Sequence, residues 1–276
     1  MKIFLTGGTG FVGSHFINEA HKVGHEVIAL KRIDSNTRVT LNRDPSWIEG
    51  TLDGDYHGVL VGCDAFVHLA AYGVSPQPAN WNDCLYWNVL KSVDLLNQAL
   101  VSGVKRVICV GTFSEYGEAS LQYEFIPPTC SLSPKGAYAT SKVAFSTVMN
   151  TLCKEYNVYA SYFRLFSIFG DGQHENNLYP SLMKAALLGE DFSMTKGEQI
   201  RDFLSVDVAA KQIVEGLEFN NVGLGSTSFS NIGSGRPQSI LEFSEYYWDR
   251  WNAKGRLNVG SLPYRTNEIM RYVAQI

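Results

Sequence analysis

The sequence predicts an α/β fold in which a parallel sheet carries helices on both faces and a small lobe follows at the C-terminal end. Short apolar runs typical of buried strands alternate with longer segments whose apolar residues recur at helical spacing. Strands separated by helices of this length favour parallel pairing with right-handed crossovers. With 276 residues, 45% of them hydrophobic, the chain can bury a large core.

The first part of the chain carries this alternation. Lys2 to Thr6 has the pattern of a strand, Phe11 to Val23 that of an amphipathic helix, and Glu26 to Leu30 that of a second strand. These three segments predict a βαβ unit. The expected strands that follow are residues 65–69, 106–110 and 158–163, and the expected helices are residues 81–101 and 138–155.

After Gly170 the alternation gives way to loops, with helices expected over residues 178–188, 207–219 and 239–251. We expect residues 1–170 to form a dinucleotide-binding core, for the reasons given below. Residues 171–276 are expected to form mainly a lobe over the C-terminal edge of the sheet, where open α/β folds bind ligands, with residues 202–232 returning to the core.

The bulk properties exclude several classes of function. The net charge of -4 and the lack of a Lys/Arg block give no field for nucleic acid or an anionic membrane. There is no apolar run of membrane-spanning length and no signal peptide at the N-terminus, so we expect a cytoplasmic protein. The five scattered cysteines predict buried thiols in a reducing compartment rather than a disulfide framework or a metal site.

A glycine-rich loop, TGGTGFVG, joins the first strand to the first helix. Gly7, Gly10 and Gly13 permit a tight turn, a close approach of the backbone to a pyrophosphate, and close packing of helix on strand. The free N–H groups at the start of a helix bind anions. Because the loop opens a βαβ unit, it predicts a dinucleotide site rather than an ordinary glycine turn.

The end of the second strand indicates which dinucleotide. An NAD site usually has an acidic residue there for the ribose 2'-hydroxyl, whereas this chain has Lys31 and Arg32, with Ser35 and Arg38 just beyond. Guanidinium groups pair well with phosphate, so the pattern favours NADP(H). The alternative is that Lys31 and Arg32 are solvated surface cations.

Tyr138 and Lys142, in YATSK, are four residues apart on a predicted helix, so their side chains project from one face. A phenol titrates near 10 in water, and an ammonium one turn away is expected to lower that pKa toward neutrality. Thr112 ends the preceding strand and can donate a hydrogen bond to a substrate carbonyl. Together with the glycine loop, the three residues predict a catalytic site rather than a coincidental surface pair.

These motifs resemble those of the extended short-chain dehydrogenase/reductase family, the sugar-nucleotide epimerases, dehydratases and reductases. TGGTGFVG, VHLAA, GTFSEYG and YATSK match its motifs along nearly the whole chain. The resemblance implies a Rossmann-type doubly wound parallel sheet with a small C-terminal substrate-binding lobe, and it places Asn88, otherwise only a helix-surface amide, at a buried position. The cofactor-binding residues implied are Gly7, Thr9, Gly10, Phe11, Val12, Lys31, Arg32, Leu52, Leu69, Ala70, Ala71, Tyr138, Lys142 and Phe166.

The resemblance also implies a nucleotide-diphosphate sugar as substrate. Asn177 and Arg201 match positions that hold the diphosphate in relatives, Arg265 is a further phosphate-binding candidate, and Ser114 is expected beside the sugar. An amide and two cations suit a diphosphate in a mostly neutral protein. The alternative for each arginine is a surface ion pair, such as Arg201 with Asp202.

Departures from the family pattern narrow the reaction. The dehydratases follow the catalytic threonine with Asp and Glu, and the epimerising reductases place a cysteine two residues after it; this chain has Phe113 and Ser114. His174 is a candidate base for deprotonation next to a ketone, so epimerisation stays an alternative. The chain is most similar to 4-ketoreductases of the CDP-abequose and CDP-paratose synthase type.

That similarity implies hydride transfer from NADPH to the C4 ketone of a 4-keto-6-deoxy or 3,6-dideoxy hexose. Tyr138 is then expected to donate the proton, Lys142 to hold the cofactor ribose, and Thr112 to polarise the carbonyl. Two alternatives remain, an NAD(P)-dependent nucleotide-sugar 4-epimerase and a non-enzymatic dinucleotide sensor. By analogy, the helices of residues 81–101 and 138–155 can form a homodimer contact.

Overall fold

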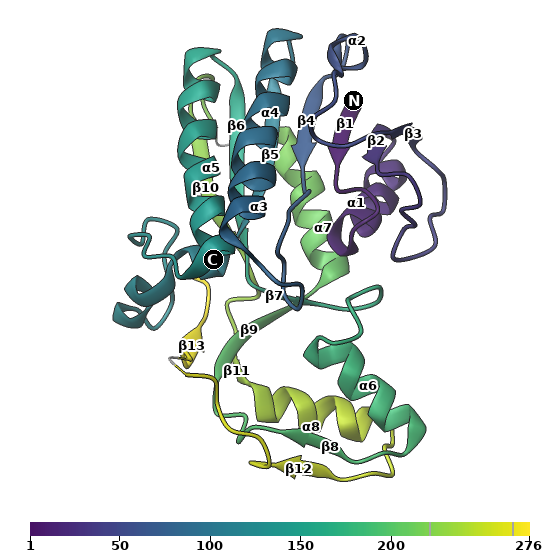
Figure 1. The fold of residues 1–276 in the computed structure, drawn as a ribbon, viewed down its shortest axis with the longest axis vertical. Coiled ribbons are helices and arrows are strands. Elements are labelled where there is room, and N and C mark those ends of the chain that lie inside the picture. The colour runs from purple at the N-terminus through teal and green to yellow at the C-terminus, as the bar shows by residue number, and fades with distance from the viewer. Residues whose placement is uncertain (221, 267) are drawn as a thin grey trace.

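The computed structural model describes residues 1–220, 222–266 and 268–276. The apolar run Lys2–Thr6 forms β1 inside a seven-stranded sheet of order β10-β6-β5-β4-β1-β2-β3 (Figure 1). All neighbouring strands run parallel. This is the doubly wound Rossmann order, so the predicted fold class is confirmed. The other strands are β2 (Glu26–Lys31), β3 (Ser46–Glu49), β4 (Ala65–His68), β5 (Arg106–Thr112), β6 (Tyr159–Leu165) and β10 (Thr227–Ile232).

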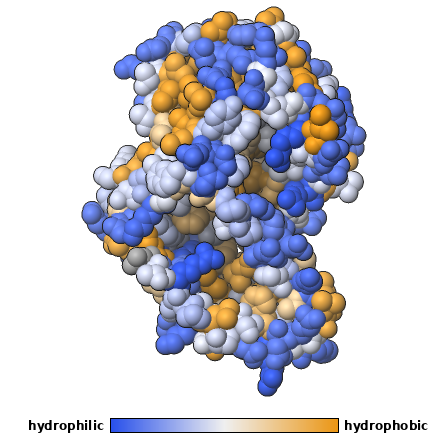
Figure 2. Space-filling view, in the orientation of Figure 1, coloured by the Kyte–Doolittle hydropathy of each residue, from blue (hydrophilic) through white to orange (hydrophobic). Residues whose placement is uncertain are grey.

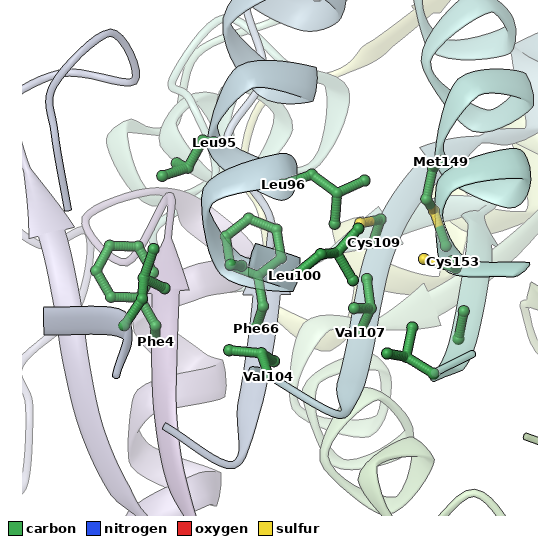
Figure 3. Packing of buried hydrophobic residues seen from close by; sticks show 14 of the residues in the cluster. Phe4, Phe66, Leu95, Leu96, Leu100, Val104, Val107, Cys109, Met149 and Cys153 are labelled. Atoms are coloured by element: carbon green, nitrogen blue, oxygen red, sulfur yellow. The ribbon is translucent and has the colours of Figure 1, made fainter. Parts of the chain in front are cut away.

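Helices cover both faces of this sheet because successive strand residues point to opposite sides. Ile3 and Leu5 pack toward α1 (Phe11–Lys22) and α7 (Val206–Glu215), which lie side by side on one face. Phe4 packs on the other face, in a cluster beneath α2, α4 and α5 that Figure 3 shows from close by. The helices of this face are α2 (His57–Leu60), α4 (Ser92–Val101) and α5 (Gly136–Glu155).

The segment expected to be one helix over residues 81–101 has three parts. Asn80 caps α3 (Trp81–Leu85) by accepting the Asp83 N–H at 2.9 Å. A π-helical segment, Tyr86–Lys91, follows before α4 begins at Ser92. A π turn inserts one extra residue into a helix and is common at functional sites. Here it contains Asn88, which is buried.

Within the described residues, the lobe consists of two small sheets and two helices, arranged as Figure 1 shows. In the larger sheet β9 (Ile200–Ser205) pairs with β7 (Ser167–Phe169), β11 (Pro237–Ser239) and β13 (Arg271–Tyr272). In the smaller, β8 (Phe192–Met194) pairs with β12 (Leu257–Val259). Helices α6 (Leu178–Leu188) and α8 (Ile240–Arg250) pack together through apolar side chains.

Helix α8 begins one residue later than expected because Ser239 is its cap. The Ser239 hydroxyl accepts the Glu242 N–H at 3.0 Å, and the Glu242 carboxylate accepts the Ser239 N–H at 2.7 Å, which is a capping box. Helix α7 likewise ends at Glu215, short of the expected residue 219, and a 3₁₀ turn (Gly216–Glu218) follows.

The C-terminal ends of the sheet strands face the lobe, and Figure 2 shows the surface hollowed between the two parts. We call the part containing the seven-stranded sheet the sheet half. All five cysteines are buried and free, as predicted. Within the described residues, no helix has the length and apolar character needed to span a bilayer.

Candidate active site

The glycine loop between β1 and α1 is shaped for an anion. Gly7 has a φ of 76°, and a Cβ there would lie 2.6 Å from the Ala70 nitrogen. A Cβ at Gly13 would overlap the Gly7 carbonyl. Helix α1 starts at Phe11 without a side-chain cap on its first N–H groups, so these remain available to a phosphate. The loop therefore fits a dinucleotide pyrophosphate.

Beside the loop is a cavity of about 360 Å³ with two arginines in its wall. Lys31, predicted for this site, lies elsewhere: its ammonium is 3.5 Å from Glu49 Oε1 and 5.7 Å from the centre of the Trp47 ring. Glu49 is the last residue of β3, a strand that the sequence pattern did not predict. The cavity is lined by Thr9, Gly10, Arg32, Ser35, Asn36, Thr37 and Arg38.

The structure brings the loop after β4 against the glycine loop. The Ala70 N–H donates to the Thr6 hydroxyl at 3.3 Å, and the same hydroxyl lies 2.8 Å from His68 Nδ1. The remaining predicted cofactor residues lie around this junction or in the core nearby: Phe11 and Val12 in the first turn of α1, Leu69 and Ala71 after β4, Leu52 against the core beneath α4, and Phe166 after β6.

His68 was not predicted as a site residue. It is buried between the rings of Phe66 and Phe145, whose centroids lie 5.9 and 5.3 Å away. Burial, reinforced by the charge of Lys142, lowers the pKa of His68 to about 3. The imidazole is therefore neutral at physiological pH and adds no charge beneath Lys142.

Tyr138 and Lys142 lie one turn apart at the start of α5, as predicted. Lys142 is only 2% exposed; burial lowers the pKa of its ammonium, while Glu115 and Cys109 raise it. The expected lowering of the Tyr138 pKa is wrong for the protein alone. Burial, with further contributions from the Glu115 carboxylate and the Cys84 thiol, raises that pKa above its ordinary value.

Thr112 ends β5 and begins a 3₁₀ turn, Phe113–Glu115. Its hydroxyl accepts the Ser114 N–H at 3.3 Å and lies 3.1 Å from the Ser114 hydroxyl, so the two hydroxyls form a pair. The Phe113 ring packs 4.6 Å from that of Tyr272. The two residues that directly follow Thr112 therefore carry an aromatic ring and a hydroxyl.

Asn88 joins the loop after β4 to α5. Its amide oxygen accepts the Tyr72 N–H at 2.7 Å, and its amide nitrogen donates to the Tyr72 carbonyl and to the Ser141 hydroxyl, each at 3.0 Å. Ser141 in turn donates to the Tyr138 carbonyl at 2.8 Å. Asn88 thus tethers α5, the helix that carries Tyr138 and Lys142, and it is buried, as the family resemblance implied.

The sequence also missed Glu115, a fully buried carboxylate. It accepts the Thr112 N–H at 2.9 Å, the Tyr162 hydroxyl at 2.9 Å and Arg164 Nε at 2.8 Å. Two features of the sequence hint at this ion pair: an acidic residue within the otherwise uncharged segment GTFSEYG, and an arginine at the end of a buried strand. Neither feature alone identifies the pairing.

The candidate substrate residues are spread over the lobe. Arg201 on β9 pairs with Glu268 at 2.9 Å and lies 5.6 Å from the centre of the Tyr272 ring, whose other neighbour is Phe113. The Tyr272 ring therefore lies between Arg201 and Phe113, the first residue of the turn that follows Thr112. The expected alternative partner of Arg201, Asp202, is turned away and accepts hydrogen bonds from the backbone of residues 234, 235 and 274.

Asn177 and Arg265 lie in different surroundings. Asn177 is the N-cap residue of α6 and is half-buried, and its side chain does not cap the helix. Arg265 is exposed on the segment between β12 and β13, close in sequence to Glu268. The structure thus brings Arg201 toward the Thr112 side of the cleft and leaves Arg265 on the surface.

Comparison with known proteins identifies the family. The profile of the NAD dependent epimerase/dehydratase family matches residues 3–232. The chain is 26% identical to CDP-abequose synthase of Salmonella muenchen, over 98% of this chain and 87% of that protein. It is also 26% identical to UDP-glucose 4-epimerase of Corynebacterium glutamicum, over 89% of this chain and 79% of that protein.

Solved structures share the fold over the whole chain. UDP-N-acetylglucosamine 4-epimerase of Methanobrevibacter ruminantium, in complex with UDP-N-acetylmuramic acid, superimposes with a TM-score of 0.89 at 24% identity, covering 100% of this chain and 89% of that one. UDP-glucose 4-epimerase of Thermotoga maritima gives 0.85 at 22% identity, covering 100% and 90%. From its motifs, its fold and the match to residues 3–232, the chain belongs to the NAD dependent epimerase/dehydratase family, that is, to the extended short-chain dehydrogenases/reductases.

Proposed function

We propose that the protein is an NADPH-dependent reductase that converts the C4 ketone of a nucleotide-diphosphate 4-keto-6-deoxy or 3,6-dideoxy hexose into an alcohol. The observation that carries the choice of cofactor is the cavity beside the glycine loop. Arg32, Ser35 and Arg38 lie in its wall, where a ribose 2'-phosphate would meet two guanidinium groups and a hydroxyl.

The residues around Thr112 support ketone reduction. NADPH, when bound, supplies a hydride. Burial raises the pKa of Tyr138, so the phenol carries its proton at neutral pH. It can donate that proton to the forming alkoxide, and the Lys142 ammonium one turn away would stabilise the phenolate that remains. The paired hydroxyls of Thr112 and Ser114 can polarise the carbonyl, and Lys142 can hold the nicotinamide ribose.

The substitutions at positions 113 and 114 argue against elimination of water. Phe113 is packed among aromatic rings, and the carboxylate of Glu115 is bonded to Arg164 and buried. The relatives named CDP-abequose synthase match nearly the full chain and support the substrate class. Lobe residues Asn177 and Arg201 are the proposed contacts of the diphosphate.

An NAD(P)-dependent 4-epimerase is the second candidate, because relatives with that name match 89% of the chain and solved neighbours contain NAD. One assay separates the two functions. The purified protein is offered CDP-, dTDP-, UDP- and GDP-linked 4-keto-6-deoxyhexoses with NADPH or NADH and, separately, UDP-glucose with no cofactor added. A reductase consumes NADPH in proportion to product, whereas an epimerase interconverts UDP-glucose and UDP-galactose without added cofactor. The second result, with NADPH unconsumed, would contradict the proposal.

A further inference from the structure

A carboxylate lies under the catalytic pair and has no part in the chemistry described above. Burying a carboxylate is costly unless it is paired and its oxygens accept hydrogen bonds. Glu115 meets both conditions, since Arg164 Nε donates to Oε2, and the Thr112 N–H and the Tyr162 hydroxyl both point to Oε1. Each of these contacts is 2.9 Å or shorter.

Neighbouring residues make room for this carboxylate. A side chain at Gly111 would overlap Glu115 Oε1 and would lie 2.5 Å from the Tyr162 ring, so only glycine fits at that point of β5. The Arg164 guanidinium lies 5.0 and 5.3 Å from the ring centres of Tyr116 and Phe229, which shield its charge from water. The ion pair is therefore built into the fold.

The contacts of Glu115 reach both catalytic elements. Through the Thr112 N–H it holds the end of β5. Through Tyr162 it reaches α5, because the Tyr162 hydroxyl lies 2.9 Å from Glu115 and 3.2 Å from the Lys142 carbonyl. The strand that ends in the catalytic hydroxyl and the helix turn that carries the catalytic lysine are thus tied to one buried group.

We propose that Glu115 is a positioning residue of the active site, which fixes the end of β5 against the Lys142 turn of α5 and places a carboxylate, paired with Arg164, close to the turn that carries Tyr138 and Lys142. This inference rests on the proposed function for its kinetic consequences. It adds a role for a residue that lies outside the Thr112, Tyr138 and Lys142 set.

The charges around the pair give the sign of the effect. For both Tyr138 and Lys142, burial is the largest influence on the pKa, and Glu115 raises the pKa of each. Glu115 thus helps Lys142 to remain an ammonium in spite of burial and helps Tyr138 to hold its proton at higher pH. The other titratable groups that face this site are Cys84 on α3, His68 on β4, Cys109 on β5, Tyr116 after Glu115, and Tyr162 and Arg164 on β6.

The test replaces Glu115→Gln, which keeps the shape and removes the charge. We expect the alkaline limb of kcat/KM for ketone reduction to move down by about one pH unit, the smallest shift typical of losing a neighbouring charge. A second readout needs neither cofactor nor substrate: ¹³Cε-lysine NMR of the free protein, with Lys142 assigned from a Lys142→Met sample, should show its titration moving to lower pH. Glu118→Gln is the matched control, because Glu118 pairs with Lys135 on the surface, and both readouts should stay in place.

Two further variants keep the test decisive. Glu115→Gln leaves Arg164 unpaired and can fail to fold. Glu115→Gln/Arg164→Gln removes both charges and should give smaller downward shifts, because the lost guanidinium charge offsets part of the lost carboxylate charge. Tyr162→Phe removes the bridge but keeps the charge; kcat should fall about threefold to tenfold, with KM and the pH limb unchanged, for one lost hydrogen bond.

The outcomes separate the two proposals. Shifts in both readouts support the role of Glu115. If the alkaline limb and the Lys142 titration both stay in place in either Glu115 variant, the proposed role of Glu115 is wrong, even if the protein is an active reductase. If the Lys142 titration moves to lower pH but the protein has no reductase activity, the proposed function is wrong while the proposed role of Glu115 is supported.

Discussion

The sheet half and the lobe present their polar groups to the cleft in opposite ways. In the sheet half, the first N–H groups of α1 have no side-chain cap, and Arg32 and Arg38 line an open cavity. In the lobe, Arg201 is already paired with Glu268 at 2.9 Å. The cofactor side is thus preformed, whereas a phosphate that reaches Arg201 has to displace a carboxylate from it.

This difference bears on the free energy of binding. Little of the binding free energy is lost to reorganisation when a ligand enters a preformed site. Where the ligand replaces the partner of an ion pair, binding gains only the difference in free energy between the new contact and the old one. We therefore expect the largest effects of substitution in the sheet half and smaller effects in the lobe. The predictions below follow that order.

Tyr138→Phe should have the largest effect, because it removes the proton donor and keeps the ring. Turnover should fall by about a hundredfold or more, the usual contribution of a general acid, while NADPH affinity stays within a few-fold. Steady-state kinetics and fluorescence titration of NADPH measure the two quantities. Turnover near that of the unaltered protein would remove Tyr138 from the mechanism.

Arg32→Ala and Arg38→Ala should each weaken NADPH binding by about tenfold to a hundredfold, the value of a hydrogen bond to a charged group. NADH affinity should change little, because NADH lacks the 2'-phosphate. Lys31→Ala is the matched control, since Lys31 lies against Glu49 and Trp47. If NADPH and NADH bind equally tightly to the unaltered protein, the cavity does not select the phosphorylated cofactor.

Substitutions in the lobe should change ligand affinity less, and they should include both losses and gains. Arg201→Gln should weaken binding of a nucleoside diphosphate by about tenfold. Glu268→Gln should tighten it by about twofold to fivefold, because the phosphate then has no carboxylate to displace from Arg201. Calorimetry with CDP and UDP measures both. Arg256→Gln, which breaks the surface pair with Asp191, should change nothing. Weaker binding in Glu268→Gln would mean that Glu268 supports Arg201 rather than competes for it.

The same contrast describes how much the sequence could predict. The sheet half follows from local patterns: apolar runs gave the strands, and the spacing of Tyr138 and Lys142 placed both on one helix. Even there, β6 continues to Leu165 instead of ending near Phe163. It does so because Arg164 and Leu165 still pair with β5 and β10, and the buried charge of Arg164 is balanced by Glu115.

Features set by distant contacts could not be predicted. The π-helical segment depends on the bonds of Asn88 to Tyr72 and Ser141, which lie 16 and 53 residues away. In the lobe, β7, β8, β11 and β12 have three residues each, too few to show an alternating pattern. Arg201 likewise finds its partner 67 residues away instead of at the adjacent Asp202.

The central claim is that a dissociable NADPH reduces a sugar ketone at this site. The most direct measurement is a reaction of the protein with a nucleotide-linked 4-keto-6-deoxyhexose and NADPH that carries deuterium at the transferring C4 position, followed by NMR and mass spectrometry of the sugar. We predict one deuterium at C4 of the product and one NADPH oxidised for each sugar reduced. Conversion of a nucleotide sugar at C4 with no deuterium gained and no NADPH consumed would contradict the claim and identify an epimerase.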